Sequence, residues 1–312
     1  MKVLFVSSNK SGEVSVITKS QGISLEKKGI QIQYFLINGK GIKGYLASII
    51  PFKKGIKEFK PDIIHAHYSH CGFFSALFLA KPLVVSLMGS DVNRNIISIY
   101  LLKVFQKLFW EKTIVKTRGM SKRIEEELAE VIPNGINIEL FRPISQKKCL
   151  EALNWDRNKK HILFAADPEI HVKNFKLFHA SLISYQQYFS NIEYHTLVNV
   201  DHESVPIYMN AAEVVCLSSL SEGSPNVIKE AMACNRPVVC TNVGDVQWLF
   251  GNTEGCFISE SQTPESYKNK LNKALEYSKI SQESKGRKRI MELGLDSDTV
   301  ANKIINIYQC VI

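Results

Sequence analysis

The sequence lacks any apolar segment of the roughly 20 residues that a membrane-spanning helix requires. Its seven cysteines are an odd number without C-x-x-C spacing, which argues against a disulfide framework and favours reduced, structural thiols in a cytoplasmic protein. The loop after the first apolar run has no G-x-G-x-x-G, which argues against an NAD-dependent enzyme. That first run, KVLFVSS, is too short for the core of a signal peptide and predicts a strand.

Charge is distributed unevenly along the 312 residues, although 45% hydrophobic and 22% charged residues are typical of a globular protein. The length allows two domains. Residues 1–145 hold 21 Lys and Arg against 11 Asp and Glu, whereas the remainder holds 18 against 19. The basic first half predicts an anionic partner for that half. No nucleic-acid-binding motif accompanies the charge, so we expect no nucleic acid among the partners.

Short β-rich runs alternate with helical patterns along the whole chain. The runs are KVLFVSS, IQIQYFLI, DIIHAH, PLVVSLMG, TIVKT and EVIPN, and then HILFAAD, IEYHTLVNV, EVVCLSS and PVVCT. This alternation predicts two α/β domains, each a Rossmann-like, doubly wound parallel sheet. We expect an N-terminal domain over 1–145, a C-terminal domain over 146–295, and a C-terminal helix over 296–312 that packs back on the N-terminal domain. Ligands of such folds bind beyond the carboxyl ends of the strands.

A helix is predicted to begin within SEGSPNVIKEAMA, after a turn that starts at Gly223. Ser224 is expected to be its N-cap and Pro225 its first residue. The backbone amides of Asn226 and Val227, together with the helix dipole, then form an anion site suited to the diphosphate of a nucleotide.

Two carboxylates flank this helix start, Glu222 before the turn and Glu230 one turn beyond Asn226. Helix geometry tilts the Glu230 side chain back towards the terminus, where it could accept both hydroxyls of a ribose. Glu222 would lie on the other side of the phosphates, beside a transferred group. The alternative is that Glu222 only complements the helix dipole and that Glu230 is a half-exposed helix acid.

The E-x7-E stretch SEGSPNVIKEAMACNRPVV, preceded by MNAAEVVCLSS and followed by TNVGD, resembles the nucleotide-sugar site of the retaining GT-B glycosyltransferases of family 4. PDIIHAHYSH, VVSLMGSDV, VIPNGINIELFRP and ILFAADPEIHVKN occur in the expected order, so the resemblance covers nearly the whole chain. It implies a GT-B fold, with two domains facing each other across a cleft. It also implies that Glu230 binds the ribose and that Glu222 contacts the donor sugar as a catalytic group.

The family also clamps the donor diphosphate with an arginine and a lysine. Lys173 in HVKNF matches the lysine, for which a solvated lysine at a helix start is the alternative. Pro168 stands at the arginine position, five residues earlier. His171 or Arg236 could supply the missing positive charge.

HAHYSH offers several histidines, at spacings that raise the question of zinc. His65 and His67 share one face of a strand. No acidic or cysteine ligand completes a set nearby, so a metal is the weaker interpretation. In the family this stretch lines the acceptor side, which places His67 there and leaves His65 as a core histidine.

The loop LMGSDV follows the fourth strand and is expected to face the acceptor. Met88 replaces the histidine that family members commonly carry before the glycine, which leaves Gly89, Ser90 and Asp91 as the polar residues of the loop. Asp91 could orient an acceptor hydroxyl or act as a base, and a helix N-cap is the alternative. In SSNKSGEV, Gly12 matches the family loop at which the backbone approaches the donor diphosphate.

Two stretches of the first half, KGYLASIIPFKKGIKEFK and NRNIISIYLLKVFQKLFWEKTIVKTR, combine aromatic and aliphatic residues with lysines. They predict a surface that rests on an anionic membrane. The alternative is an apolar core stripe with a solvated face of lysines.

Together these features predict a retaining glycosyltransferase, cytoplasmic or peripheral at the inner face of a membrane. It would move a hexose from a nucleoside diphosphate sugar to a glycan or lipid-linked glycan in surface polysaccharide synthesis. The resemblance implies no cofactor and no metal. The alternatives are a catalytically weak GT-B protein that binds nucleotide sugars for a partner enzyme, and a GT-B sugar-nucleotide epimerase.

Overall fold

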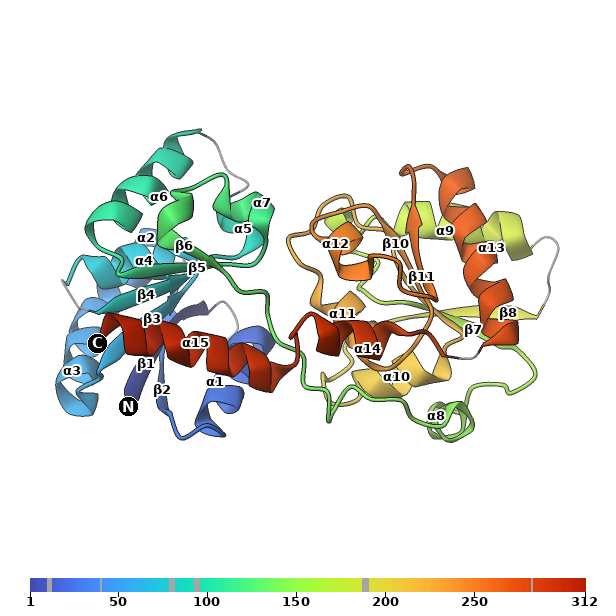
Figure 1. The fold of residues 1–312 in the computed structure, drawn as a ribbon, viewed down its shortest axis with the longest axis horizontal. Coiled ribbons are helices and arrows are strands. Elements are labelled where there is room, and N and C mark those ends of the chain that lie inside the picture. The colour runs from blue at the N-terminus through green and yellow to red at the C-terminus, as the bar shows by residue number, and fades with distance from the viewer. Residues whose placement is uncertain (10–12, 40, 79–81, 93–95, 187–190, 282) are drawn as a thin grey trace. The chain divides into compact units, whose positions relative to one another are not determined.

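The chain forms two compact units in the computed structural model, which describes residues 1–312 except 10–12, 40, 79–81, 93–95, 187–190 and 282. The first unit comprises Met1–Gly135 and Ser297–Ile312, and the second comprises Ile136–Asp296 (Figure 1). The division falls before residue 145 because Ile136 and Phe141 are buried in the core of the second unit. Each unit is an α/β domain around one parallel sheet, which confirms the predicted fold class.

Six parallel strands form the sheet of the first unit, in the order β2-β1-β3-β4-β5-β6. The strands are β1 (Lys2–Asn9), β2 (Gln31–Asn38), β3 (Ile63–His67), β4 (Leu83–Ser86), β5 (Lys112–Val115) and β6 (Ala129–Val131). The helices are α1 (Val16–Glu26), α2 (Gly41–Ala47), α3 (Ile49–Phe59), α4 (Ser69–Ala76), α5 (Gly89–Val92), α6 (Ile96–Leu108), α7 (Arg118–Ser121) and α15 (Ser297–Val311), with a 3₁₀ turn at Glu126–Leu128.

Helices cover both faces of this sheet, because alternate residues of a strand point to opposite sides. Val3 and Phe5 of β1 belong to a core that includes Ile304 of α15, which runs beside α1 (Figure 1). Leu4 and Val6 belong to the core on the other face. The C-terminal helix is therefore part of the first unit.

The sequence favours one helix from Tyr45 to Phe59, but the structure divides it into α2 and α3. Pro51 gives the physical reason, because it has no N–H to donate to the carbonyl of Ala47 and interrupts the helical ladder there.

The sheet of the second unit has five parallel strands in the order β11-β10-β9-β7-β8. The strands are β7 (Lys160–Phe164), β8 (Ile192–Thr196), β9 (Val214–Leu217), β10 (Val238–Thr241) and β11 (Cys256–Ser259). The helices are α8 (Gln146–Leu153), α9 (Phe175–Gln186), α10 (Val205–Ala211), α11 (Asn226–Ala233), α12 (Val246–Phe250), α13 (Pro264–Ile280) and α14 (Gly286–Glu292), with a 3₁₀ turn at His171–Lys173. The sequence did not predict β11, which is a short edge strand with mostly half-buried residues.

All seven cysteines are free thiols, and Cys310 is the exposed one. Across the described ranges, no helix combines the length and the apolar composition needed to cross a bilayer.

Candidate functional site

Three loops at the carboxyl ends of neighbouring strands bring the predicted donor residues together in the second unit. They follow β7, β9 and β10, which are adjacent in the sheet. Lys173, after β7, donates from Nζ to Oε1 of Glu222, after β9, over 2.6 Å. Ser219 donates its hydroxyl to the same oxygen over 2.8 Å. Both bonds use Oε1, and no donor from the described residues reaches Oε2 of Glu222.

Hydrogen bonds to backbone carbonyls fix these loops to one another. The amide of Leu220 donates to the carbonyl of Val172 over 2.8 Å, and the hydroxyl of Thr241 donates to the carbonyl of Ser219 over 2.7 Å. The lysine and the glutamate are therefore carried by segments that are themselves hydrogen-bonded together, and their pairing does not depend on one contact between flexible side chains.

Gly244 explains why TNVGD accompanies the glutamate motif. Its φ is +59°, and a Cβ at this position would lie 2.1 Å from the carbonyl oxygen of Gly223. The next residue, Asp245, donates its amide to the same oxygen over 3.1 Å. Only glycine allows this approach, so the loop after β10 supports the loop that carries Glu222.

Helix α11 begins one residue later than the sequence suggested. Pro225 has φ −70° and ψ 111°, an extended conformation, and therefore occupies the N-cap position. The prediction of Ser224 as N-cap is wrong for this reason, and Gly223 and Ser224 both lie in the loop. Asn226 and Val227 are the first two residues of the helix, at the end where the helix dipole favours an anion.

Glu230 lies on α11 and is 8% exposed, so the alternative of a half-exposed helix acid is wrong. Its Oε1 lies 3.1 Å from Nε2 of His202, in the loop between β8 and α10. The hydrogen bond to Glu230 raises the pKa of His202 above its ordinary value, against the effect of burial. Among the residues that the structure describes, no donor reaches Oε2 of Glu230. Each of the two glutamates therefore keeps one carboxylate oxygen for a ligand.

A buried cation lies in the same helix. Lys229 is fully buried, and burial lowers its pKa to about 8 although the charges of Asp245 and Glu230 oppose that shift. Arg236 follows the other end of α11, where it precedes β10 and points Nη1 towards the carbonyls of Asn210 and Ala212 at 3.5 Å. It therefore lies at the amino ends of the strands and cannot complete the clamp.

Two other residues of the loop after β7 have different surroundings. His171 is exposed and shares the 3₁₀ turn with Lys173, so it lies near the pair. Pro168 lies earlier in the loop and offers no charge. In this loop, Lys173 is the cation that pairs with Glu222. The position of the family's clamp arginine is occupied by Pro168 and carries no charge.

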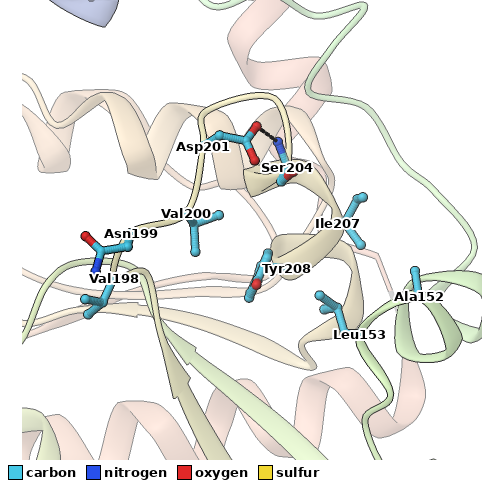
Figure 2. A pocket seen from close by; sticks show the side chains of 9 residues that line it. All are labelled: Ala152, Leu153, Val198, Asn199, Val200, Asp201, Ser204, Ile207 and Tyr208. Carbon is cyan, nitrogen blue, oxygen red and sulfur yellow. Dashed lines mark hydrogen bonds between the residues drawn. The ribbon is translucent and has the colours of Figure 1, made fainter.

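A pocket of about 310 Å³ lies beside the loop that carries His202, and none of the predicted site residues lines it. Figure 2 shows Leu153 of α8 facing Tyr208 of α10, with Asp201 at the start of α10. Asp201 accepts the backbone amide of Ser204 over 3.0 Å, and hydrogen bonding from the Ser204 hydroxyl, together with that amide, lowers the pKa of its carboxyl group. The carboxylate thus stabilises the start of the helix.

The two histidines of β3 in the first unit differ in their bonding. Nδ1 of His65 lies 2.6 Å from the hydroxyl of Tyr308, and Nε2 lies 2.9 Å from that of Ser86. His65 is therefore the core histidine that the sequence suggested. His67 is also fully buried, but neither of its ring nitrogens has a partner within the described residues. Burial, aided by the charge of Lys116, lowers the pKa of His67 to about 3, so the imidazole is neutral.

Asp91 is 1% exposed and holds its own loop together. Oδ1 accepts the amide of Ser69 over 3.0 Å and its hydroxyl over 2.6 Å, and Oδ2 accepts the amide of Met88 over 2.6 Å. Because α5 begins at Gly89, Asp91 is its third residue and reaches back to the preceding amide as in a capping box. The suggestion that Asp91 is an N-cap is corrected accordingly.

The remaining predicted residues of the first unit lie at the same strand ends. Gly89 is partly exposed and Ser90 is exposed, directly after β4. Gly12 lies outside the described residues.

Sequence reasoning missed His202, Ser219 and Lys229. His202 has no motif of its own, and only the fold brings it to Glu230. Ser219 is close to Glu222 in sequence but does not differ from other loop serines. Lys229 lies within the quoted motif, and its position before Glu230 in a helix with buried neighbours was the available signal.

Two family models match the chain. One, described as glycosyltransferase family 4, matches residues 9–140, and the other, described as glycosyl transferases group 1, matches residues 184–290. The first match covers most of the first unit and ends five residues inside the second, and the second match contains both glutamates.

Curated relatives include a Bacillus subtilis protein that carries a provisional name as a teichuronic acid biosynthesis glycosyltransferase, 26% identical over 65% of this chain. The chain spans 58% of that relative's length. An Escherichia coli protein named UDP-Gal:alpha-D-GlcNAc-diphosphoundecaprenol alpha-1,3-galactosyltransferase is 23% identical, with 84% of this chain and 80% of that protein covered.

Solved structures share the fold over the full length. Sucrose-phosphate synthase from Thermosynechococcus elongatus aligns with a TM-score of 0.81 and 16% identity, covering 99% of this chain and 98% of that chain. Anabaena HepE in complex with UDP and glucose aligns with a TM-score of 0.78 and 17% identity, covering 99% of this chain and 100% of that chain.

Proposed function

The chain belongs to the GT-B glycosyltransferases of family 4, and from that premise we propose that it transfers a hexose from a nucleoside diphosphate sugar to an acceptor hydroxyl. The observation that carries the proposal is the arrangement of Glu222, Lys173 and Glu230 around the start of α11. UDP complexes of a structural neighbour and the UDP-Gal name of a relative support UDP-hexoses as the first donors to test.

Each group of the donor site has a separate task in this proposal. The first turn of α11 and Lys173 bind the diphosphate and stabilise the charge that develops on it as the bond to the sugar breaks. Glu230 accepts the two ribose hydroxyls, one at its unoccupied oxygen and the other at Oε1 in competition with His202. Glu222 accepts a hydroxyl of the donor sugar, and its ion pair with Lys173 joins the sugar site to the diphosphate site.

Positive charge and backbone amides supply the stabilisation of the leaving group, so we propose a reaction that needs no metal ion and no cofactor. We also propose retention at the anomeric carbon. The acceptor is a glycan or lipid-linked glycan bound by the first unit at Gly89 and Ser90, in the synthesis of a surface polysaccharide, whereas the fully buried His67 lies behind that surface. The diphosphoundecaprenol acceptor in the name of the Escherichia coli relative supports this choice.

The test combines binding and turnover. A thermal-shift screen with UDP-, GDP- and ADP-sugars should identify a donor that raises the melting temperature, because a ligand of the folded state stabilises it by mass action. That donor should then glycosylate polyprenyl-diphosphate N-acetylglucosamine with retention and in the presence of EDTA. If no nucleotide or nucleotide sugar shifts the melting temperature, the donor site is wrongly assigned.

Two outcomes of the same assays would replace the proposal. Donor binding without turnover on a broad acceptor panel would indicate a nucleotide-sugar-binding partner protein. Interconversion of nucleotide sugars without any acceptor would indicate an epimerase.

The first unit also carries an exposed apolar surface, for which we propose contact with an anionic membrane from the cytoplasmic side. Ile42, Leu46 and Ile50 on α2 and α3 are 79%, 60% and 79% exposed, and Ile96 and Ile97 at the start of α6 are 86% and 79% exposed. That these exposed side chains form one patch is part of the proposal, and such a patch favours a membrane or protein partner. The exposed lysines of α2 and α3 make the anionic membrane the better match: Lys43, Lys53 and Lys57, beside Lys54, which pairs with Glu58.

Vesicle co-sedimentation tests this surface. Ile42→Ser with Ile50→Ser should reduce binding to phosphatidylglycerol vesicles, and added salt should reduce wild-type binding. Ile280→Ser is the matched control, because Ile280 of the second unit is 90% exposed. Lys103 and Lys107 of α6 pair with Glu125, so their substitution should matter less. Binding that is unchanged in the double variant would exclude this surface.

A further inference from the structure

Three potential metal ligands, His161, Glu193 and His195, gather on strands β7 and β8 of the second unit. His161 pairs with Glu193 in the sheet register, and His195 lies two residues further along β8 on the same face. One ligand atom from each side chain lies within 4.8 Å of the other two. The sequence pattern raises the question of zinc only at the histidines of the first unit, and the proposed transfer reaction uses none of these three residues.

The distances are close to those of a metal site. Nδ1 of His161 lies 3.0 Å from Nε2 of His195 and 3.9 Å from Oε2 of Glu193. Tetrahedral zinc with metal–nitrogen bonds of about 2.0–2.1 Å holds its ligand atoms about 3.3 Å apart. Relative to that spacing, the distance between His161 and His195 would lengthen by about 0.3 Å, the distance between His161 and Glu193 would shorten by about 0.6 Å, and the third distance, which is within 4.8 Å, would shorten by at most about 1.5 Å. Side-chain rotations could supply changes of this size.

His161 is oriented as a metal ligand would be. Its ring is fully buried, and Nε2 donates to the backbone carbonyl of Asp156 over 2.8 Å. This bond fixes the proton on Nε2 and leaves the lone pair on Nδ1, directed at His195. A ligating histidine usually donates its other ring N–H to a carbonyl or carboxylate in this way.

The other two side chains are also held in place. The ring of His195 stacks on Trp155 with centroids 3.4 Å apart, which fixes the orientation of the imidazole. Oε1 of Glu193 pairs with Lys159, which leaves Oε2 for the ion. Glu193 and His195 are only half-buried, so the fourth position is open to water.

We propose that His161, Glu193 and His195 bind one divalent transition-metal ion, with Zn²⁺ as the best match to two imidazoles and one carboxylate. The ion would join the edge strand β8 to β7 and so stabilise the second unit. His161 lies at the amino end of β7, whereas Lys173 follows its carboxyl end, so the metal takes no part in sugar transfer. The donor-site proposal and the metal-site proposal can therefore be tested separately, and the failure of one would leave the other standing.

Metal-free protein in a Cys310→Ser background, which removes the exposed thiol, should bind one Zn²⁺ per chain in calorimetric titration. Zinc should raise the melting temperature, and Co²⁺ at the same site should give visible absorption bands. His195→Ala and Glu193→Gln should each remove the zinc-dependent shift. Both replace half-buried side chains, and a retained nucleotide-induced thermal shift would show that the second unit is folded.

His179→Gln is the matched control, because His179 contacts Tyr194 on the opposite face of the same strand and should leave zinc binding unchanged. Absence of zinc uptake by the wild-type chain at a large molar excess would overturn the proposal. Undiminished uptake by the folded His195→Ala variant would overturn it as well.

Discussion

The acidic side chains at the strand ends of the two units are bonded in opposite ways. Asp91 of the first unit is almost fully buried, and its two oxygens accept three hydrogen bonds from its own scaffold. In the second unit, Glu222 uses one oxygen, which accepts hydrogen bonds from Lys173 and Ser219. Glu230 also uses one oxygen, which is bonded to His202. A carboxylate whose oxygens are all occupied stabilises a fold, whereas one with an unoccupied oxygen can accept a ligand. The difference separates a structural acid from two candidate binding acids of the same charge.

Glu222→Gln tests this comparison with the largest expected effect. The substitution preserves shape but removes the charge that Lys173 pairs with, so stabilisation of the transition state should be lost. We expect turnover of the identified donor to fall about 100-fold or more, with the melting temperature little changed. Initial rates at saturating donor measure the effect.

Glu254→Gln is the control for that experiment, since Glu254 is an exposed acid of the same unit whose carboxylate lies outside the donor loops. A Glu222→Gln enzyme with nearly wild-type turnover would contradict the role of the unoccupied oxygen.

Asp91→Ala tests the other side of the comparison. The variant leaves the amides of Ser69 and Met88 buried without their acceptor, which should reduce the free energy of unfolding of the first unit by about 2–4 kcal/mol. Calorimetry should show the transition of that unit at a lower temperature, while nucleotide binding by the second unit is retained. An Asp91→Ala protein of native stability that has lost all turnover would instead make Asp91 a catalytic base.

Glu230→Gln should affect binding more than stability. Hydrogen bonds to charged groups are stronger than neutral ones by about 1 kcal/mol, so the affinity for the free nucleoside diphosphate should fall about 5-fold. Titration calorimetry with UDP, or with the diphosphate found in the screen, measures it. Glu203→Gln, on the loop beside His202, controls for the loss of a nearby charge. Equal losses in both variants would mean that Glu230 acts only through long-range electrostatics.

The sequence was sufficient for the features that depend on local pattern. Apolar runs bounded by turns located ten of the strands, and the spacing of Glu222 and Glu230 located the donor loop. The sequence was insufficient where a contact depends on long-range packing, or where the role of a residue depends on the exact residue at which a helix begins. His202 meets Glu230 across 28 residues, and Asp91 acts as the third residue of α5 because that helix begins at Gly89.

The pairing of His202 with Glu230 predicts a smaller, pH-dependent effect. The pKa of His202 is raised in the folded protein, so its contribution to stability is fully present below the unfolded value of about 6.5 and is lost as pH rises through the folded pKa. His202 also competes with the ribose for Glu230, and the competition is strongest when His202 is protonated. Nucleotide affinity should therefore increase as pH rises from about 6 to about 8, by less than about 5-fold because His202 is partly exposed.

His202→Gln distinguishes two ways in which the ribose could use Glu230, because it removes the titrating group and should flatten the pH profile of binding. If the ribose displaces His202, wild-type affinity rises with pH and nucleotide binding releases protons, which calorimetry in buffers of different ionisation enthalpy detects. If the ribose uses Oε2 alone, the pair with Oε1 stays intact and the wild-type profile is flat. A flat wild-type profile would show that His202 does not compete with the ribose and that only the unoccupied oxygen, Oε2 of Glu230, binds it.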